Sequence, residues 1–146
     1  MYRLIIISLL LVYSLSSACQ ELPDEKRIKE TVMAYVDSWW HSNVLQAEGA
    51  LHPDMKKMIV VQHPYTKQDF INSYGRSTYI EYIRANGNDT IKGIEIPATQ
   101  IKILDYESGI ASVKVENSEF LDYIQLVKWN DEWKILNVVW GKPEEK

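Results

Sequence analysis

The segment from Phe120 to Trp140 constrains the fold most, because it carries the most regular pattern in the chain. β-Branched and aromatic residues recur with a period of two on both sides of Asn130-Asp131. Two such runs separated by a two-residue polar step are typical of a β-hairpin. The segment therefore predicts two antiparallel strands joined by a tight turn at Asn130-Asp131.

A two-residue turn also determines which side chains share a face of the hairpin. Counting back from the turn places Asn137 opposite Ile124 and Val139 opposite Asp122. The face that we expect to be interior then consists of Asp122, Ile124, Leu126, Trp133, Ile135, Asn137 and Val139. Asp122 and Asn137 are polar interruptions of this apolar wall. The assignment depends on the turn, since a slip of one residue exchanges the two faces.

Upstream of this hairpin the apolar residues follow a helical period. From Asp24 to Trp40 they recur at steps of three and four residues, which predicts one amphipathic helix. A second helix is expected over 44–51, ended by His52-Pro53, because proline disfavours helical geometry in the residue before it. The other expected elements are strands over 55–62 and 69–74, a helix over 77–85, and strands over 93–106, 110–117, 119–129 and 133–140. Helices segregated from a mainly antiparallel sheet predict an α+β fold, with the sheet curved around the first helix and a conical cavity open at one end.

The first 18 residues have the three-part layout of a secretory signal peptide: Arg3, an apolar stretch, and a small-residue run before Cys19. The apolar stretch is shorter than the roughly 20 residues of a membrane-spanning helix. Cys19 is the only cysteine, and its surroundings resemble a bacterial lipoprotein signal, in which this residue is lipidated. Ordinary cleavage before Cys19 is the alternative. We expect a tether over 19–24, one domain over 25–141 and a charged tail over 142–146, in a periplasmic or cell-envelope lipoprotein or, alternatively, a freely secreted protein.

Composition and spacing exclude several classes of function. The net charge is −4 at pH 7 and there is no basic run, so nucleic acid is not expected as a partner. His41, His52 and His63 are spaced evenly, but Pro53 and Pro64 prevent one continuous helix from presenting them together, so no metal site is expected. No glycine-rich phosphate loop is present, and no cofactor is predicted.

Three stretches carry a resemblance to a known superfamily: YVDSWWHSN over 35–43, LHPDMK over 51–56 and DYIQLVKWNDEWKILNVVW over 122–140. They resemble the nuclear transport factor 2 and ketosteroid isomerase superfamily, in the branch described as putative lumazine-binding and near the SnoaL-like proteins. The resemblance covers about residues 25 to 140. It implies a cone-shaped α+β barrel, with three N-terminal helices packed on a strongly curved mixed or antiparallel sheet.

His63 and Asp122 are the candidate catalytic residues, although catalysis is not the favoured function. The resembling isomerases carry a general-base carboxylate at an Asp-Pro step, and this chain has His63-Pro64 at a comparable place. Histidine titrates near neutrality and can act as a base. The structural alternatives are an exposed turn histidine and an Asp122 that only satisfies a backbone amide or a tyrosine hydroxyl.

Three functions remain open from the sequence. The first is a non-catalytic, membrane-tethered domain that binds a small, largely apolar or heteroaromatic ligand in its cone. The residues expected to contact this ligand are Tyr35, Trp39, His52, His63, Tyr65, Asp122 and Asn137. The second is an isomerase-, dehydratase- or hydrolase-like enzyme that moves a proton through His63 or Asp122. The third is a module that forms homodimers through an outer sheet face made of Leu121, Tyr123, Val138 and Trp140.

Overall fold

The computed structural model describes residues 23–86 and 95–144. The expected signal peptide and Cys19 lie outside the described residues. The helices are α2 (Asp24–Trp40), α3 (Val44–Ala50) and α4 (Arg76–Asn86). The strands are β1 (Leu51–Gln62), β2 (Asp69–Gly75), β3 (Gln100–Glu107), β4 (Ile110–Glu116), β5 (Leu121–Trp129) and β6 (Glu132–Gly141). No helix among the described residues is long and apolar enough to cross a membrane.

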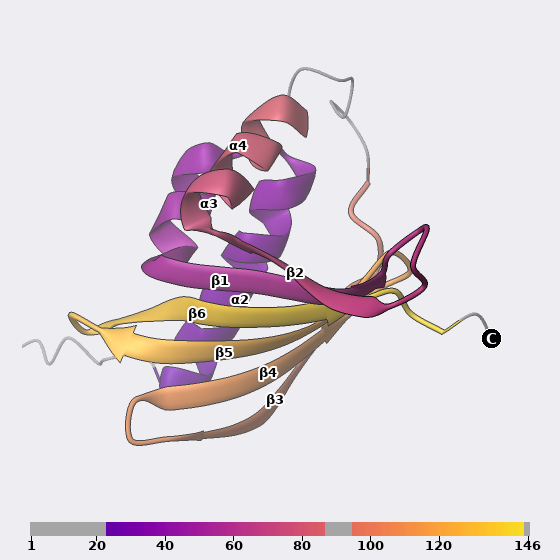
Figure 1. Cartoon of the computed structure of the whole chain (residues 1–146). Helices are drawn as coiled ribbons and strands as arrows, with labels where there is room; N and C mark the ends of the chain where they lie inside the picture. Colours follow the sequence, from indigo (N-terminus) through magenta and orange to yellow (C-terminus); the bar gives the residue numbers. More distant parts are fainter. Residues whose placement is uncertain (1–22, 87–94, 145–146) are drawn as a thin grey trace, which may run out of the picture.

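The six strands form one curved sheet in the order β2-β1-β6-β5-β4-β3. β1 and β6 run parallel, and every other neighbouring pair is antiparallel. The three helices pack on one face of the sheet, with α2 behind the middle strands in Figure 1. The predicted α+β class and the packing of three helices on a curved mixed sheet are confirmed. The sheet is open, however, because β2 and β3 are edge strands and do not pair with each other.

β1 begins earlier than the sequence predicts, at Leu51 instead of Met55. His52 and Pro53, which were expected to lie between a helix and a strand, are part of this strand. The register between β1 and β6 shifts between Leu51 and Lys56, so Pro53 occupies an irregular stretch of the ladder. A proline is tolerated there because the irregular stretch does not need the backbone N–H that proline lacks.

The β5–β6 hairpin has the predicted tight turn. Asn130 and Asp131 have φ values of 50° and 62°, which are the left-handed conformations of a two-residue type I′ turn. The predicted pairs nearest the turn, including Leu126 with Ile135, are present.

Farther from the turn the predicted register is wrong by one residue. A bulge at Leu136 makes Gln125 pair with Asn137, Ile124 with Val138, and Asp122 with Trp140. One extra residue in one strand moves every later side chain of that strand to the opposite face. Asn137 and Val139 therefore lie on the outer face, and Val138 and Trp140 lie on the inner face.

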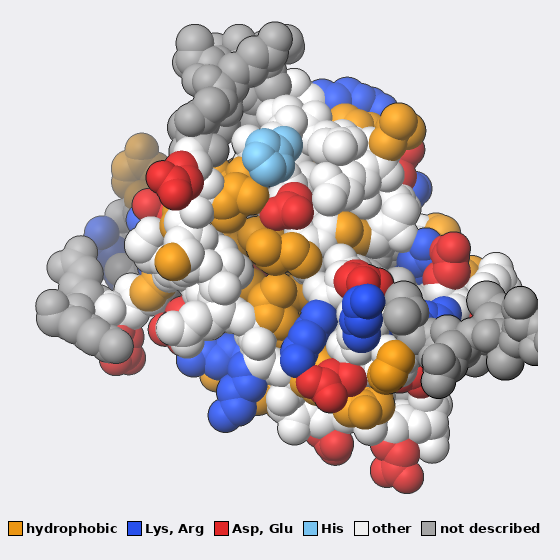
Figure 2. Space-filling view, turned by 180° about the vertical axis from the view of Figure 1, so that it is seen from behind, with side chains coloured by type: hydrophobic (Ala, Val, Ile, Leu, Met, Phe, Trp, Pro, Cys, Tyr) orange, Lys and Arg blue, Asp and Glu red, His pale blue; other side chains and the backbone are white. Residues whose placement is uncertain are grey.

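The core lies between α2 and the concave face of the sheet. Ile28, Val32 and Val36 recur along one side of α2 and are fully buried. Sheet residues of the core include Val113, Val115, Ile124, Leu126, Ile135 and Val138. Seen from behind, some hydrophobic side chains also gather on the surface near the middle of the molecule, beside an acidic side chain and a histidine (Figure 2). The apolar face of α2 and the apolar face of the sheet thus pack against each other in one core, as expected for amphipathic elements.

Candidate functional site

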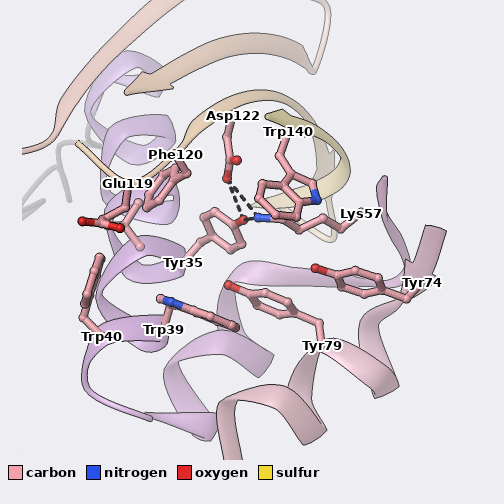
Figure 3. Close-up of a pocket in the computed structure, with 11 residues that line it drawn as sticks. Tyr35, Trp39, Trp40, Lys57, Tyr74, Tyr79, Glu119, Phe120, Asp122 and Trp140 are labelled. Carbon is pink, nitrogen blue, oxygen red and sulfur yellow. Dashed lines mark hydrogen bonds and ion pairs between the residues drawn. The ribbon is translucent and has the colours of Figure 1, made fainter. Parts of the chain in front are cut away.

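A cavity of about 230 Å³ opens between α2, α4 and the concave face of the sheet. It is smaller than the roughly 300–1,000 Å³ typical of pockets for drug-sized ligands. Its lining residues are Tyr35, Val36, Trp39, Trp40, Lys57, Tyr74, Tyr79, Glu119, Phe120, Asp122 and Trp140 (Figure 3). Most of them are aromatic, so the cavity suits a small, flat molecule.

Stacked rings make one wall of the cavity. The ring of Tyr79 on α4 stacks with Tyr35 at 5.5 Å, with Trp39 at 5.8 Å and with Tyr74 at 6.5 Å between centroids. Tyr35 and Trp39 can both reach Tyr79 because residues four apart lie on the same side of a helix. The wall is thus assembled from α2, α4 and the end of β2.

Three polar side chains meet in the wall of the cavity (Figure 3). The Tyr35 hydroxyl donates to Asp122 Oδ2 at 2.8 Å, and Lys57 Nζ donates to the Tyr35 hydroxyl at 2.5 Å. Lys57 Nζ also forms an ion pair with Asp122 Oδ2 at 3.2 Å. α2, β1 and β5 each supply one member of this polar triad. Asp122 is fully buried, so its charge depends on these partners.

Burial changes the acid–base properties of the triad. Burial raises the pKa of Tyr35 well above its ordinary value, and the nearby Asp122 carboxylate raises it further. The phenol therefore remains a hydrogen-bond donor. Burial lowers the pKa of Lys57, while Asp122 opposes this shift. Lys57 consequently releases its proton more easily than a surface lysine does.

The ammonium of Lys57 also lies within an aromatic cage. Its Nζ is 5.2 Å from the centroid of the Tyr35 ring, 5.7 Å from Tyr79 and 5.2 Å from Trp140. Cation–π contacts within about 6 Å are attractive. A cationic ligand would have to displace the lysine that already occupies this cage, so we expect a neutral ligand or one that carries hydrogen-bond acceptors.

Three buried polar atoms of lining residues have no hydrogen-bond partner: Asp122 Oδ1, Trp40 Nε1 and Trp140 Nε1. Buried polar atoms in proteins are nearly always satisfied, and each one that is not calls for an explanation. They are one acceptor and two donors on residues that line the cavity, with Trp40 and Trp140 on opposite sides of it (Figure 3).

The comparisons with known proteins agree with this architecture. Residues 23–141 match the family model described as putative lumazine-binding. The chain belongs to this family. A comparison with curated protein sequences finds no match.

Solved structures of nuclear transport factor 2-like (NTF2-like) proteins share the fold of this putative lumazine-binding family member. One, of unknown function, from Silicibacter pomeroyi is 17% identical, with a TM-score of 0.62 over 82% of this chain and 98% of the other. Another, from Shewanella baltica, is 11% identical, with a TM-score of 0.59 over 84% and 95%. A putative dehydratase from the NTF2-like family of Streptomyces avermitilis is 12% identical, with a TM-score of 0.51 over 84% and 97%. At these identities the likeness concerns the fold alone.

Three of the residues that the sequence predicted to contact a ligand lie together in the cavity wall. Tyr35, Trp39 and Asp122 all line the cavity. Asp122 also has the tyrosine hydroxyl partner that the structural alternative expected, and it keeps one free oxygen.

His63 and Tyr65 lie elsewhere, at the turn between β1 and β2. His63 Nδ1 accepts a hydrogen bond from the backbone N–H of Thr66 at 3.2 Å, and its ring lies beside Phe70. Tyr65 is 89% exposed. Neither side chain lines the cavity, so His63 is not placed to exchange protons with Asp122 there.

His52 and Asn137 also lie outside the cavity lining. His52 Nδ1 accepts from the backbone N–H of Asp54 at 3.1 Å, and its ring meets Trp129 edge-on at 4.7 Å between centroids. Asn137 donates to Gln125 Oε1 at 3.1 Å on the outer face. The bulge at Leu136 explains the position of Asn137. In a regular hairpin this side chain would lie on the inner face, and the extra residue moves it to the outer face.

The sequence analysis missed Lys57, the cationic member of the triad. The signal was present, since alternation along β1 places Lys57 on the same face as buried Met55. A lysine at an inward position of an apolar strand needs an anionic partner. Tyr74 and Trp140 were also not assigned to the site, because their positions depend on how β2 and the bulged β6 pack.

Among residues 23–86 and 95–144 there is no group of three or more His, Cys, Asp or Glu side chains arranged to hold a metal ion.

Proposed function

We propose that this protein is an exported, lipid-anchored domain that binds a small, flat, largely apolar or heteroaromatic ligand in the cavity beside the Tyr35–Lys57–Asp122 triad. The observation that carries the proposal is a cavity with stacked aromatic walls whose lining residues include buried polar atoms without partners. Such a combination of apolar area and few polar groups is typical of small-molecule sites.

The polar atoms favour a heteroaromatic ring over a plain hydrocarbon. A hydrocarbon would leave Asp122 Oδ1 and the two indole N–H groups unsatisfied, and each unsatisfied buried group costs about 1–3 kcal/mol. A ring that carries both N–H and carbonyl groups on its edge would recover part of this cost. Lumazine, the compound in the family's description, is a flat bicyclic ring of this kind and is the natural first probe.

A fluorescence titration with lumazine tests the binding function. Trp39 stacks with Tyr79 in the cavity wall, so Trp39→Ala should weaken binding about 10-fold or more, equivalent to the loss of about 1.4 kcal/mol. Trp129→Ala is the matched control, because Trp129 packs against His52 outside the cavity lining. No saturable response in the wild type, or equal losses in the two variants, would contradict a site in this cavity.

The lipid anchor rests on the sequence around Cys19 and on the export signal before it. Its test is Cys19→Ser, which should move the protein from the membrane fraction to the soluble fraction of the envelope. Labelling of the wild type with a radioactive fatty acid, and loss of that label in the variant, would support lipidation. Unchanged fractionation of the variant would contradict it.

A proton-transfer enzyme is the second candidate, and one observation favours it. Asp122, Lys57 and Tyr35 place three titratable groups within hydrogen-bond reach of each other in a ligand-sized cavity. His63 does not lie near these groups, because it is hydrogen-bonded within the β1–β2 turn and does not line the cavity. Release of modified ligand after prolonged incubation would distinguish turnover from simple binding.

A further inference from the structure

We propose that Lys57 is a nucleophile that captures aldehyde or ketone carbonyl groups of aromatic ligands as a Schiff base. The proposal rests on the proposed binding function and adds a covalent step to the same cavity. It assigns the chemical class of the ligand: a small aromatic ring that carries an aldehyde or a ketone.

The position of Lys57 supports this role. It is the one lysine among the described residues that lines the cavity, and its side chain is 10% exposed. Its Nζ lies near the rings of Tyr35, Tyr79 and Trp140, so a ring held in the cavity brings its substituent to the amine. Holding two reacting groups together in this way is a large part of catalysis.

Among the residues that the structure describes, no other lysine is buried. Lys29 forms an ion pair with Glu25, Lys114 with Glu116, and Lys134 with Glu132. In Lys114, the pairing with Glu116 raises the pKa, which keeps that amine protonated. Burial acts in the opposite direction on Lys57 and makes its neutral form easier to reach. Desolvation in an apolar pocket is a known way to activate a lysine.

The triad also provides a path for the protons. Asp122 first accepts a proton from the Lys57 ammonium, across the 3.2 Å contact, and this frees the nitrogen lone pair. The nitrogen attacks the carbonyl carbon, a C–N bond forms, and a proton passes from nitrogen to the former carbonyl oxygen. Asp122 then returns its proton to this hydroxyl, the C–O bond breaks, and water leaves as the C=N bond forms. The products are one protonated imine and one water, with no other reactant required.

Tyr35 is a positioning residue in this scheme. Its hydroxyl accepts a hydrogen bond from Lys57 and donates one to Asp122 Oδ2, so it holds the two groups in place. A bound ring would also exclude water from the amine, which further favours the neutral form over the ammonium.

The test uses the full chain, benzaldehyde as the probe and sodium cyanoborohydride to reduce the imine, followed by peptide mapping. The expected result is one benzyl adduct per chain, located on Lys57 and formed about 10-fold faster or more than adducts on surface lysines, because the cavity holds the aldehyde beside the Lys57 amine. Lys57→Met should abolish this adduct, whereas Lys102→Met on exposed β3 should leave it unchanged. Mapping of the wild type decides the question even if the Lys57 variant folds poorly.

Benzyl alcohol separates the covalent step from the binding function, because it has nearly the same shape and no carbonyl. If benzyl alcohol binds in the cavity but benzaldehyde gives no preferential adduct on Lys57, the Schiff base is refuted and the binding site stands. If neither compound binds and adducts are spread over surface lysines, the Schiff base is refuted, and the lumazine titration decides separately whether the binding site stands.

Discussion

The two faces of the β5–β6 hairpin each carry a polar residue, and the two residues differ in burial and in hydrogen-bond partners. On the inner face, Asp122 is fully buried and depends on Tyr35 and Lys57. On the outer face, Asn137 forms a single amide hydrogen bond with Gln125, next to solvent. A regular hairpin would have placed Asp122 and Asn137 on the same wall. The bulge at Leu136 separates them, so one extra residue decides which polar group belongs to the site.

The largest expected difference between the faces concerns stability. Asp122→Ala removes the anion that compensates buried Lys57, and removal of one partner of a buried ion pair costs about 3–5 kcal/mol. Asn137→Ala removes only an outer-face amide and should change the free energy of unfolding by about 0.5 kcal/mol or less. Urea denaturation measures both variants. Similar losses in the two would mean that the triad is not a buried charge cluster.

The second prediction replaces the whole triad. Tyr35→Phe, Lys57→Met and Asp122→Leu together leave no charge or hydroxyl to be satisfied, and hydrophobic replacement of a buried ion pair is often neutral or stabilising by about 1–4 kcal/mol. The triple variant should therefore recover most of the stability lost in Asp122→Ala, while losing ligand binding. If the triple variant is less stable than Asp122→Ala in the same denaturation experiment, the triad is required for folding and not chiefly for the site.

The third prediction concerns alkaline pH. Burial raises the pKa of Tyr35 and Tyr79 well above the ordinary value of 10.0, and raises that of Tyr74 to about 12. A tyrosine whose pKa is higher in the folded state than in the unfolded state stays protonated on folding. Its contribution to the free energy of unfolding is complete below pH 10 and is lost as the pH rises through the folded-state pKa. The Tyr74 contribution should disappear between about pH 10 and pH 12.

Lys57 acts in the opposite direction over part of this range. Because burial lowers its folded-state pKa, its charged form disfavours folding, and that penalty is relieved as the pH rises toward the unfolded value of 10.5. Above pH 10.5 the Lys57 effect is complete and the buried tyrosines dominate, so the unfolding free energy should fall steeply. Tyrosinate absorbance measured alongside the fold signal checks this. Ionisation of the three tyrosines before any loss of structure would contradict the described burial.

The smallest expected effect on stability lies on the outer face, where the homodimer predicted from the sequence needs a different set of residues. Val138 and Trp140 point inward, but Leu104, Tyr123 and Val139 are about half exposed around an outer groove. We expect Tyr123→Lys to leave the unfolding free energy nearly unchanged and to dissociate any dimer formed through this face. Sedimentation of the wild type and the variant measures this, and identical sedimentation of the two would count against the outer face as an interface.

Much of the fold follows from sequence periodicity. The helical period of α2, the alternation of β5 and β6, and the Asn130-Asp131 turn were each predicted from local pattern. The bulge at Leu136 was not, because nothing in the composition of Lys134 to Val138 marks which residue is extra. Bulges result from how both strands pack on the core.

The site was predictable to a smaller extent. Tyr35, Trp39 and Asp122 could be placed beside the cavity because they lie on regular elements whose inward face can be counted. Lys57 was missed because charged residues on strands usually face solvent, and only its long-range partner Asp122, 65 residues away, makes its burial possible.

The most direct test of the ligand site is to observe the five indole N–H groups by nuclear magnetic resonance during a titration with lumazine. Trp40 and Trp140 have unpartnered indole nitrogens in cavity-lining side chains, whereas Trp133 Nε1 already donates to Asp24 at 2.9 Å and does not line the cavity. A ligand in the cavity should shift the indole signals of Trp39, Trp40 and Trp140, and should leave those of Trp129 and Trp133 in place. Shifts confined to Trp129 and Trp133, or no shift at saturating ligand, would contradict the proposed site.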